Sequence, residues 1–311
     1  MTDKIAIIIC TANRYALLEK AVASLQQQSL PRNQYQIIVV DNSATTPEVE
    51  QAREKFASMT DILFHVEPVQ GLSHARNVGM ALAHDYPIIG YIDDDAMAAP
   101  TWAESAVLAF QHLPQVVGVG GPVAPLWEIP RPTWLADNLL CYLSVLEMGN
   151  QPRLFSVNQG IHGASMAFRA DALKAAGGFP VNLGRKGHGA ILLSNDETAL
   201  VKTMRMKGGQ FAYVPDMRVQ HWTPASRLTQ DWFRQRIAWQ MISDLLTEGN
   251  TPEQLLAWYA TTYHNYLETL PVADRNPSAL YADVAEPEKF GKQLMALYSF
   301  LLLTYLGKKP V

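Results

Sequence analysis

Short runs of β-branched and other apolar residues alternate with amphipathic helical patterns through the first half of this 311-residue chain. The first run, residues 5–10, is apolar throughout, which is typical of a strand covered on both faces. Strands that alternate with helices usually pair in parallel, because each helix carries the chain back across the sheet. The sequence therefore predicts an α/β fold with a mostly parallel sheet flanked by helices.

The same periodicities predict the other elements of this α/β region. The further strands are expected at 37–40, 62–66, 88–92, 165–169 and 211–214. The helices are expected at 17–25, 73–82, 171–176 and 197–206. Ser73 opens the second of these helices and is a residue type that favours the N-cap position. The Pro- and Trp-rich stretch 122–134 is expected to be a loop.

Beyond His221 the pattern becomes helical, and helices are expected at 232–246, 252–270 and 290–306. The last of these would be ~25 Å long, which is shorter than the ~30 Å hydrocarbon core of a membrane. We therefore expect no membrane crossing. The Leu, Tyr and Phe side chains of this helix suit packing onto the α/β region, an interfacial membrane contact or a second subunit.

Composition narrows the class of protein. Hydrophobic residues make up 48% of the chain and charged residues 17%, which is typical of a globular protein with a sizeable core. The net charge of −4 favours no polyanionic partner, so we expect no nucleic-acid binding. The two cysteines, Cys10 and Cys141, form neither a disulfide framework nor a zinc motif, which favours a reducing compartment such as the cytoplasm.

Three consecutive carboxylates, Asp93, Asp94 and Asp95, follow the expected strand 88–92. Open α/β sheets place their ligands at the carboxyl ends of the strands. Adjacent carboxylates repel one another, and a divalent cation that also bridges phosphates relieves this repulsion. The triplet therefore predicts a site for a hard cation, with a solvated acidic turn as the alternative interpretation.

Asp41 ends the expected strand 37–40 in the same way, and its carboxylate can accept hydrogen bonds from a nucleobase or a ribose hydroxyl. An Asx turn with Asn42 and Ser43 explains the same residues structurally. Arg76 lies one turn into the expected helix that follows Gly71. It is interpreted either as part of a ligand site or as a surface arginine on an amphipathic helix.

Asp196 and Glu197 stand at the start of another expected helix. Paired carboxylates can divide into a general base and an orienting partner. His221 follows the last expected strand and is either a hydrogen-bonded core histidine or a metal ligand. From the residue types alone, both interpretations stay open.

Taken together, residues 4–240 resemble glycosyltransferase family 2, whose members are nucleotide-sugar-dependent and share the Rossmann-like GT-A fold. The resemblance is carried by five segments in the order that the family has them. These segments are IICTANR at 8–14, VVDNS at 39–43, GLSHARNVG at 71–79, the triplet of the DxD type at 93–95 and GASMAFR at 163–169. Counted back from Gly208, Asp196 and Glu197 occupy the place of a Glu-Asp pair in the family, with the order of the acids reversed.

The resemblance implies an inverting transfer of one sugar from a nucleoside-diphosphate sugar to an acceptor hydroxyl, with Mn²⁺ or Mg²⁺ as cofactor. The catalytic residues that it implies are Glu197, the base by position, and Asp196. The donor nucleotide-binding residues that it implies are Thr11, Asn13, Arg14, Asp41, Arg76, Asp93 and Asp94. The metal ligands that it implies are Asp95, Asp93 and His221. Because the acids are reversed, either one can be the base.

On the same resemblance, a GT-A catalytic domain is expected at 1–225, with a nucleotide-binding half to about 115 and an acceptor half to 225. A helical region follows at 226–311. The expected acceptor is a carbohydrate or a lipid-linked sugar, used in cell-surface polysaccharide or glycolipid assembly. The C-terminal helices are candidates for a peripheral contact at the inner face of the membrane or for homodimer formation.

Two other functions fit part of the pattern. A sugar-nucleotide nucleotidyltransferase also uses acids and Mg²⁺, but we would expect a Gly-rich loop where this chain has residues 11–14. A non-catalytic nucleotide- or carbohydrate-binding protein would not need Asp93, Asp95, Glu197 and His221 together. A polysaccharide synthase normally carries membrane helices, so transfer of one sugar is favoured over polymerisation.

Overall fold

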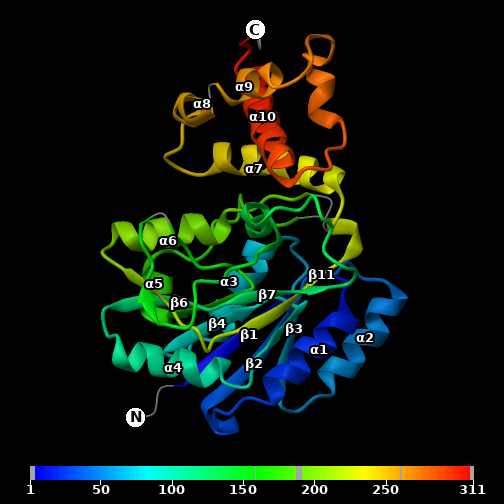
Figure 1. The fold of residues 1–311 in the computed structure, drawn as a ribbon. Coiled ribbons are helices and arrows are strands. Elements are labelled where there is room, and N and C mark those ends of the chain that lie inside the picture. Colours follow the sequence, from blue (N-terminus) through cyan, green and yellow to red (C-terminus); the bar gives the residue numbers. More distant parts are fainter. Residues whose placement is uncertain (1–3, 158, 187–190, 260, 309–311) are drawn as a thin grey trace. The chain divides into compact units, whose positions relative to one another are not determined.

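The computed structural model describes residues 4–157, 159–186, 191–259 and 261–308. The chain groups into two compact units, each made of segments that are separate in the sequence. The first unit comprises residues 1–126, 144–191 and 196–222, and the second comprises residues 127–143, 192–195 and 223–311. The first is an α/β unit, and the second is helical (Figure 1).

The first unit is built on an eight-stranded sheet with the order β3-β2-β1-β4-β9-β6-β10-β8 (Figure 1). The strands are β1 Ile5–Thr11, β2 Tyr35–Asp41, β3 Ile62–Val66, β4 Ile88–Ile92, β6 Val116–Gly120, β8 Arg153–Leu154, β9 Ser165–Arg169 and β10 Gln210–Tyr213. Strands β3, β2, β1 and β4 run parallel, and β10 is parallel to β6. Strand β9 is antiparallel to both β4 and β6, and β8 is antiparallel to β10. The predicted mostly parallel sheet is confirmed.

Alternate side chains of the central strand point to opposite faces of this sheet. Helices cover both faces. Ile5, Ile7 and Ile9 of β1 belong to one core, and Ala6 and Ile8 belong to the other. The first core is closed by α1 Tyr15–Gln26, α2 Pro47–Ala57 and α4 Trp102–His112 (Figure 1). The second is closed by α3 Leu72–Leu82, α5 Ala170–Ala175 and α6 Asp196–Met206.

A second, three-stranded sheet has the order β5-β11-β7. Its strands are β5 Ala96–Ala98, β7 Val123–Trp127 and β11 Val219–Thr223. The loop expected over 122–134 is therefore wrong for residues 123–127. Strand β7 forms by pairing with a partner almost a hundred residues away, and Pro125 is tolerated because β7 is an edge strand. Local sequence carries little signal for such a strand.

The second unit consists of helices that bury α10. The α-helices are α7 Gln230–Leu246, α8 Pro252–Tyr259, α9 Thr262–Glu268 and α10 Pro287–Tyr305. Short 3-10 helices occur in both units. In the first unit there is η1 Arg32–Gln34, and in the second there are η2 Asp137–Leu143, η3 Ala225–Arg227, η4 Val272–Asp274 and η5 Pro277–Tyr281. Helix α10 buries Phe290, Leu294 and Leu302 completely, and it packs against α7, α8 and α9.

The helix expected over 252–270 is two helices, α8 and α9, rather than one. Thr262 begins α9, and its Oγ1 donates to the carbonyl of Tyr259 at 2.8 Å. Threonine hydroxyls that bond to nearby backbone compete with regular helix, and β-branched residues favour helix weakly. These local preferences account for the break.

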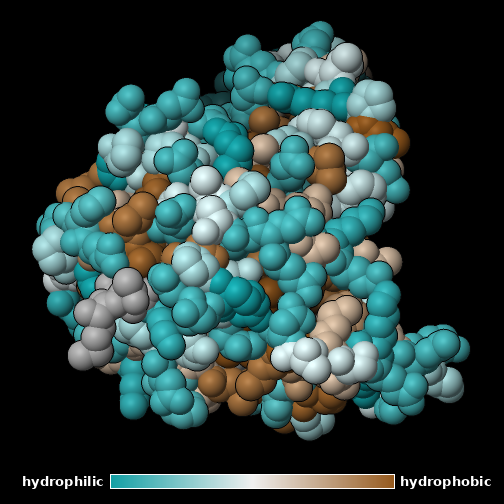
Figure 2. Space-filling model, turned by 90° about the horizontal axis from the view of Figure 1, so that it is seen from below, coloured by the Kyte–Doolittle hydropathy of each residue, from teal (hydrophilic) through white to brown (hydrophobic). Residues whose placement is uncertain are grey.

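Hydrophilic side chains predominate on the face seen in Figure 2, with hydrophobic side chains in small groups between them. This is the ordinary surface of a protein whose apolar strands are covered by helices. Within residues 4–157, 159–186, 191–259 and 261–308, the helices fall short of the combined length and apolar character that a membrane crossing requires.

Gly121, just after β6, provides a test of this packing. A Cβ at Gly121 would lie 2.0 Å from the backbone oxygen of Met217. Because a main-chain atom cannot rotate away, Gly121→Ala should cost about 1–3 kcal/mol and lower the melting temperature by roughly 2–12 °C. Gly160→Ala is the matched control, since its Cβ would meet no described atom within 4 Å and should change stability by less than about 0.5 kcal/mol. Equal melting temperatures for the two variants would contradict the packing described here.

Candidate active site

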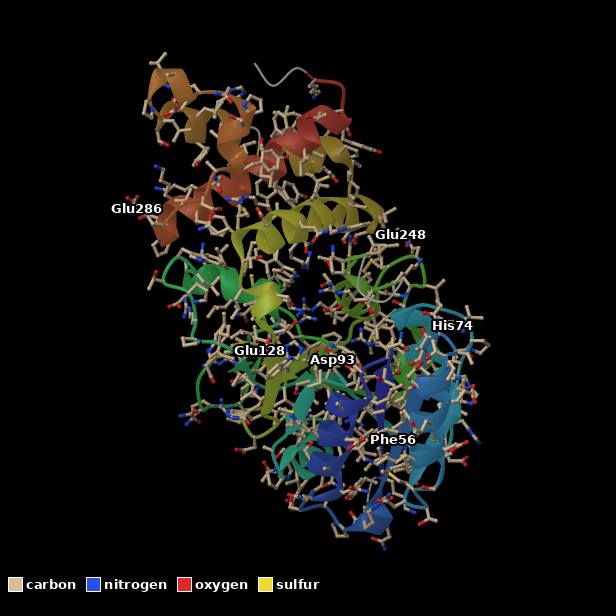
Figure 3. All side chains as sticks on the ribbon, turned by 90° about the vertical axis from the view of Figure 1, so that its right-hand side faces the viewer. Phe56, His74, Asp93, Glu128, Glu248 and Glu286 are labelled. Carbon is tan, nitrogen blue, oxygen red and sulfur yellow. The ribbon has the colours of Figure 1, made fainter. Side chains whose placement is uncertain are left out.

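The turns that follow β1 and β4 are joined by side-chain contacts, since the two strands are neighbours in the sheet. Thr11 closes β1, and its Oγ1 donates to Asp94 Oδ2 at 2.7 Å. The Arg14 guanidinium pairs with both Asp94 and Asp95. Figure 3 labels Asp93, the first acid after β4. Three of the residues predicted to bind the donor, Thr11, Arg14 and Asp94, thus lie in one cluster.

Burial and charge set the ionisation of this cluster. Asp94 is fully buried, and this burial raises the pKa of its carboxyl to about 7, while the charge of Arg14 opposes the shift. Burial alone would lower the pKa of Arg14, but the carboxylates of Asp94 and Asp95 raise it above its ordinary value. Arg14 keeps 41% of its side chain exposed, so it can also contact a ligand. A direct nucleotide contact of the buried Asp94 stays a prediction.

The candidate metal ligands Asp93, Asp95 and His221 lie together. Each offers one ligand atom, and these atoms all lie within 4.8 Å of one another. His221 reaches the cluster because β11 pairs with β5, which places His221 opposite Ala96. Its Nε2 lies 3.0 Å from Asp95 Oδ1. Two carboxylates and one imidazole form a donor set that fits Mn²⁺ or Mg²⁺.

Arg76 of α3 connects this cluster to the acid pair of α6. The side chain is buried, and its Nη1 donates to Asp196 Oδ2 at 2.6 Å, while its Nη2 donates to Asp93 Oδ1 at 3.3 Å. The guanidinium carbon lies 5.2 Å from the ring centre of Phe179. A Cβ on Gly163 would lie 2.7 Å from Nη2, so a glycine at 163 leaves room for this arrangement. The interpretation of Arg76 as a surface arginine is therefore wrong.

The two acids at the start of α6 have different environments. Burial alone would raise the pKa of Asp196, but the charge of Arg76 and a hydrogen bond with Glu197 hold it below the ordinary value. Burial raises the pKa of Glu197 to about 8, and the carboxylate of Asp196 adds to the shift. The pKa values of these two adjacent acids are thus shifted in opposite directions, with Asp196 favoured as the carboxylate of the pair.

Asp41 lies at the end of β2, and its carboxylate is bound by neighbouring side chains. It accepts from Tyr15 Oη at 2.9 Å, from Arg53 Nε at 2.6 Å and from the Ser43 N–H at 3.0 Å. The bond from Ser43 is the Asx turn considered from the sequence. Asn13 is exposed with a φ of 60°, and its N–H donates to Ser43 Oγ at 2.8 Å. A nucleotide contact of Asp41 or Asn13 stays a prediction.

The residues that hold these predicted ones in place were not predicted from the sequence. Arg53 lies on α2, a helix that was not expected. Asn42 organises the approach to α3, since its Nδ2 donates to the carbonyls of Glu67 and Val69 and its Oδ1 accepts from the Gly71 N–H. Both depend on contacts between distant segments. The motif VVDNS was a signal for Asn42, whereas nothing in the sequence singled out Arg53.

The expected N-cap role of Ser73 is wrong. Helix α3 begins at Leu72 after Gly71, which has a φ of 142°. Ser73 lies inside the helix, buried, and its Oγ donates to the carbonyl of Leu183 at 2.8 Å. Gly71 can take this conformation because it has no Cβ. The helix therefore starts one residue earlier than the sequence indicated.

A mostly parallel sheet with a carboxylate and histidine cluster at the ends of its strands, beside a buried arginine and an acid pair, defines an α/β enzyme with a polar ligand site. The family model described as glycosyl transferase family 2 matches residues 6–177, which is more than half of the chain. The chain belongs to glycosyl transferase family 2, and it is a glycosyltransferase with the GT-A fold.

Relatives with known names agree with this assignment. The glucosyl-dolichyl phosphate glucuronosyltransferase of Haloferax volcanii is 27% identical over 240 residues, covering 76% of this chain and 75% of that protein. A solved structure of the mannosyltransferase PcManGT from Pyrobaculum calidifontis, in complex with GDP-Man and Mn²⁺, matches 99% of this chain and 87% of its own with a TM-score of 0.57 and 18% identity. A structure of GalNAc-T7 with UDP, GalNAc and Mn²⁺ matches 98% of this chain and 57% of its own with a TM-score of 0.56 and 14% identity. At these identities, the solved structures show a shared fold.

Replacing Arg76 by Met should destabilise the protein in a pH-dependent way. The variant leaves the buried Asp196 unpaired, which should cost about 3–5 kcal/mol near pH 7. In the parent, the charge of Arg76 opposes the effect of burial and keeps the pKa of Asp196 low. In the variant, Asp196 stays buried without that charge, so its pKa rises above the ordinary aspartate value of about 4 and it takes up a proton as pH falls from 7, which relieves the unpaired charge. The difference in melting temperature between parent and variant should therefore shrink between pH 7 and pH 4.

Arg205→Met is the matched control for this experiment. Arg205 donates to the backbone carbonyls of Ser156, Val157 and Gln159, which do not titrate. Its loss of stability should be the same at pH 7 and at pH 4. A constant difference between parent and Arg76→Met over this range would contradict the role of the ion pair.

Proposed function

We propose that this glycosyltransferase moves one sugar from a nucleoside-diphosphate sugar to an acceptor hydroxyl with inversion at the anomeric carbon. The observation that carries the proposal is the bridge formed by Arg76. One side of its guanidinium contacts Asp93, a candidate metal ligand, and the other contacts Asp196, beside the candidate base. A transferase must hold the donor diphosphate and the acceptor hydroxyl close together in one site, and Arg76 links a group proposed to act on each of them.

The donor nucleotide is proposed to bind at the ends of β1 and β2. The exposed Asn13 and Arg14 offer hydrogen-bond donors there, with Thr11, Asp41 and Asp94 behind them. In this proposal, the nucleotide-binding half extends to about residue 115 and the acceptor half extends from 116 to 225. A fixed guanidinium beside a diphosphate stabilises charge without reorganising during the reaction.

Asp93, Asp95 and His221 are proposed to hold Mn²⁺ or Mg²⁺, for which their donor set is suitable. Such a cation, when bound, supplies Lewis-acid stabilisation of a diphosphate leaving group. The two solved structures with Mn²⁺ support this assignment through their shared fold. Arg14 contacts Asp95, so the carboxylate is oriented by a neighbour of its own.

Glu197 is proposed as the general base. In the reaction, the acceptor oxygen attacks the anomeric carbon, the bond to the diphosphate oxygen breaks, and the hydroxyl proton passes to the carboxylate of Glu197. A raised pKa suits this exchange near neutral pH, because the base must release the proton again after each turnover. Asp196, paired with Arg76, would orient its neighbour rather than take the proton.

The proposed acceptor is a sugar on a lipid phosphate, with a free carbohydrate as the alternative. Support comes from the Haloferax relative, whose name specifies a glucosyl-dolichyl phosphate acceptor. Such an acceptor would bring the protein to the cytoplasmic face of a membrane for glycolipid or polysaccharide assembly. Trp258 of α8 and Tyr305 of α10 are large exposed side chains that suit an interfacial contact. A homodimer through these helices is the competing explanation of the same exposure.

Glu197→Gln keeps the shape of the side chain and removes the proton acceptor. We expect turnover to fall by about 10²- to 10⁴-fold, because a general base contributes about that much. Donor binding should persist. Single-turnover transfer at saturating donor and acceptor, together with nucleotide titration, measures the two effects separately.

Asp196→Asn tests the other acid at the same position in the helix. It should reduce turnover less than Glu197→Gln does, because an orienting residue does not accept the proton. If Glu197→Gln turns over within a few-fold of the parent, Glu197 is not the base. A collapse confined to Asp196→Asn would assign the role to Asp196.

Metal dependence predicts a coupled thermal shift. A ligand that binds only the native state raises the melting temperature. A nucleoside diphosphate should therefore stabilise the parent far more with Mn²⁺ than in excess chelator, and Asp95→Ala should remove the difference. Asp85→Ala is the matched control, since Asp85 is 82% exposed and should leave the shift unchanged. Full transferase activity in excess chelator would exclude the metal from the mechanism.

A further inference from the structure

The residues directly before the acid pair belong to a different unit from the pair itself. Residues 192–195 group with the second unit, whereas Asp196 and Glu197 begin α6 of the first. The chain therefore passes from the second unit to the first at the peptide bond between Asn195 and Asp196. Asn195 is therefore bonded directly to the first residue of the helix that carries Glu197.

Asn195 has a φ of 70°, which lies in the left-handed region. Asparagine adopts this conformation more readily than most other residues with a side chain, and surrounding groups can hold it there. Two side chains of α7 do so. Asn195 Nδ2 donates to Asp244 Oδ1 at 2.7 Å, and Gln240 Nε2 donates to Asn195 Oδ1 at 3.0 Å. Both ends of the amide are therefore held.

The groups around Asp244 leave little freedom for another arrangement. Its Oδ1 also accepts from Gln240 Nε2 at 2.8 Å, and its Oδ2 accepts from Tyr298 Oη at 2.8 Å. Asp244 therefore accepts three side-chain hydrogen bonds in this arrangement, two at Oδ1 and one at Oδ2. Gln240 Oε1 is in turn bound by Arg236 Nη2 at 2.8 Å. The orientation of the Gln240 amide is thereby set.

The preceding residue is fixed from the same helix. The Ser194 N–H donates to Ser243 Oγ at 3.0 Å, and Arg236 Nη2 donates to Ser194 Oγ at 3.1 Å. Two successive residues ahead of the acid pair are thus tied to α7 through backbone and side chain. These hydrogen bonds are more than a helix cap requires, because one side-chain hydrogen bond is enough to cap a helix.

We propose that Asn195, held by Gln240 and Asp244 of α7, is a positioning residue that sets the placement of Glu197 for proton transfer. The inference rests on the proposed function of Glu197 as the base. It assigns a catalytic purpose to Gln240 and Asp244, which bind the residue that directly precedes α6. A displacement of about 1 Å in a reacting group can cost 10²-fold in rate, so control of a single backbone torsion at Asn195 has a measurable effect.

The test is a double-mutant cycle between Asn195→Gly and Glu197→Gln. Glycine adopts the left-handed conformation without strain, so Asn195→Gly preserves the fold and removes the two side-chain bonds. We expect kcat to fall by about 10- to 100-fold, with the KM for the donor and the melting temperature little changed. In the Glu197→Gln background, the same substitution should lower the residual kcat by no more than about twofold, because a positioning residue has no effect once the base is gone.

Two further variants complete the experiment. Asn276→Gly is the matched control, because Asn276 also makes a local side-chain bond in the second unit, to the Ser278 N–H, and its replacement should leave kcat unchanged. Gln240→Met, which removes the amide that holds Asn195, should reproduce the pattern of Asn195→Gly, and it provides the answer if Asn195→Gly fails to fold. Parental kcat in both variants, or an equal loss with and without Glu197, would overturn the positioning role. Parental turnover in Glu197→Gln alone would instead refute the base.

Discussion

The buried guanidinium of Arg76 is the interaction on which the candidate site depends. Placing a charge in the interior costs several kcal/mol unless it is paired. Asp196 and Asp93 provide this pairing, and the ring of Phe179 covers one face. The pairing also holds the pKa of Asp196 below its ordinary value, whereas burial, together with the charge of Asp196, raises the pKa of Glu197. The charge of Arg76 thus acts against burial at both acids, and the pKa falls below its ordinary value at Asp196 but not at Glu197.

The same principle organises the other half of the site. The acids after β4 cannot coexist without positive neighbours, and Arg14 supplies one to Asp94 and Asp95. His221 approaches Asp95 from the small sheet. Each carboxylate of the triplet thus has an arginine partner, Arg76 for Asp93 and Arg14 for the other two, and Asp93 is the most exposed of the three. Charge compensation, more than local backbone preference, determines which acids remain accessible to a ligand.

Hydrogen bonds to charged and polar side chains also hold residues 194 and 195 in the helical unit. Its helix α7 presents side chains that bind residues 194 and 195, and these residues lead directly into the acid pair. The left-handed conformation of Asn195 is held by hydrogen bonds with Gln240 and with the carboxylate of Asp244.

The sequence alone predicted the α/β class, several strand bounds and the acids of the site. Strands 62–66, 88–92 and 165–169 lie where they were expected. This success has a local cause, since a buried strand needs a run of apolar residues and a strand end in a parallel sheet is a natural place for ligands. The family motifs placed the candidate site residues, whose roles stay predictions.

Tertiary structure decided how those residues are partnered. Arg53 on Asp41, His221 on Asp95 and Arg76 on Asp196 join segments separated by 12, 126 and 120 residues. No local pattern specifies such pairs, because their stability comes from burial of charge and from hydrogen bonds that exist only after the elements pack. The same is true of edge strand β7 and of the left-handed Asn195. The sequence determined which chemical groups are present, and packing determined their neighbours, their ionisation and their exposure.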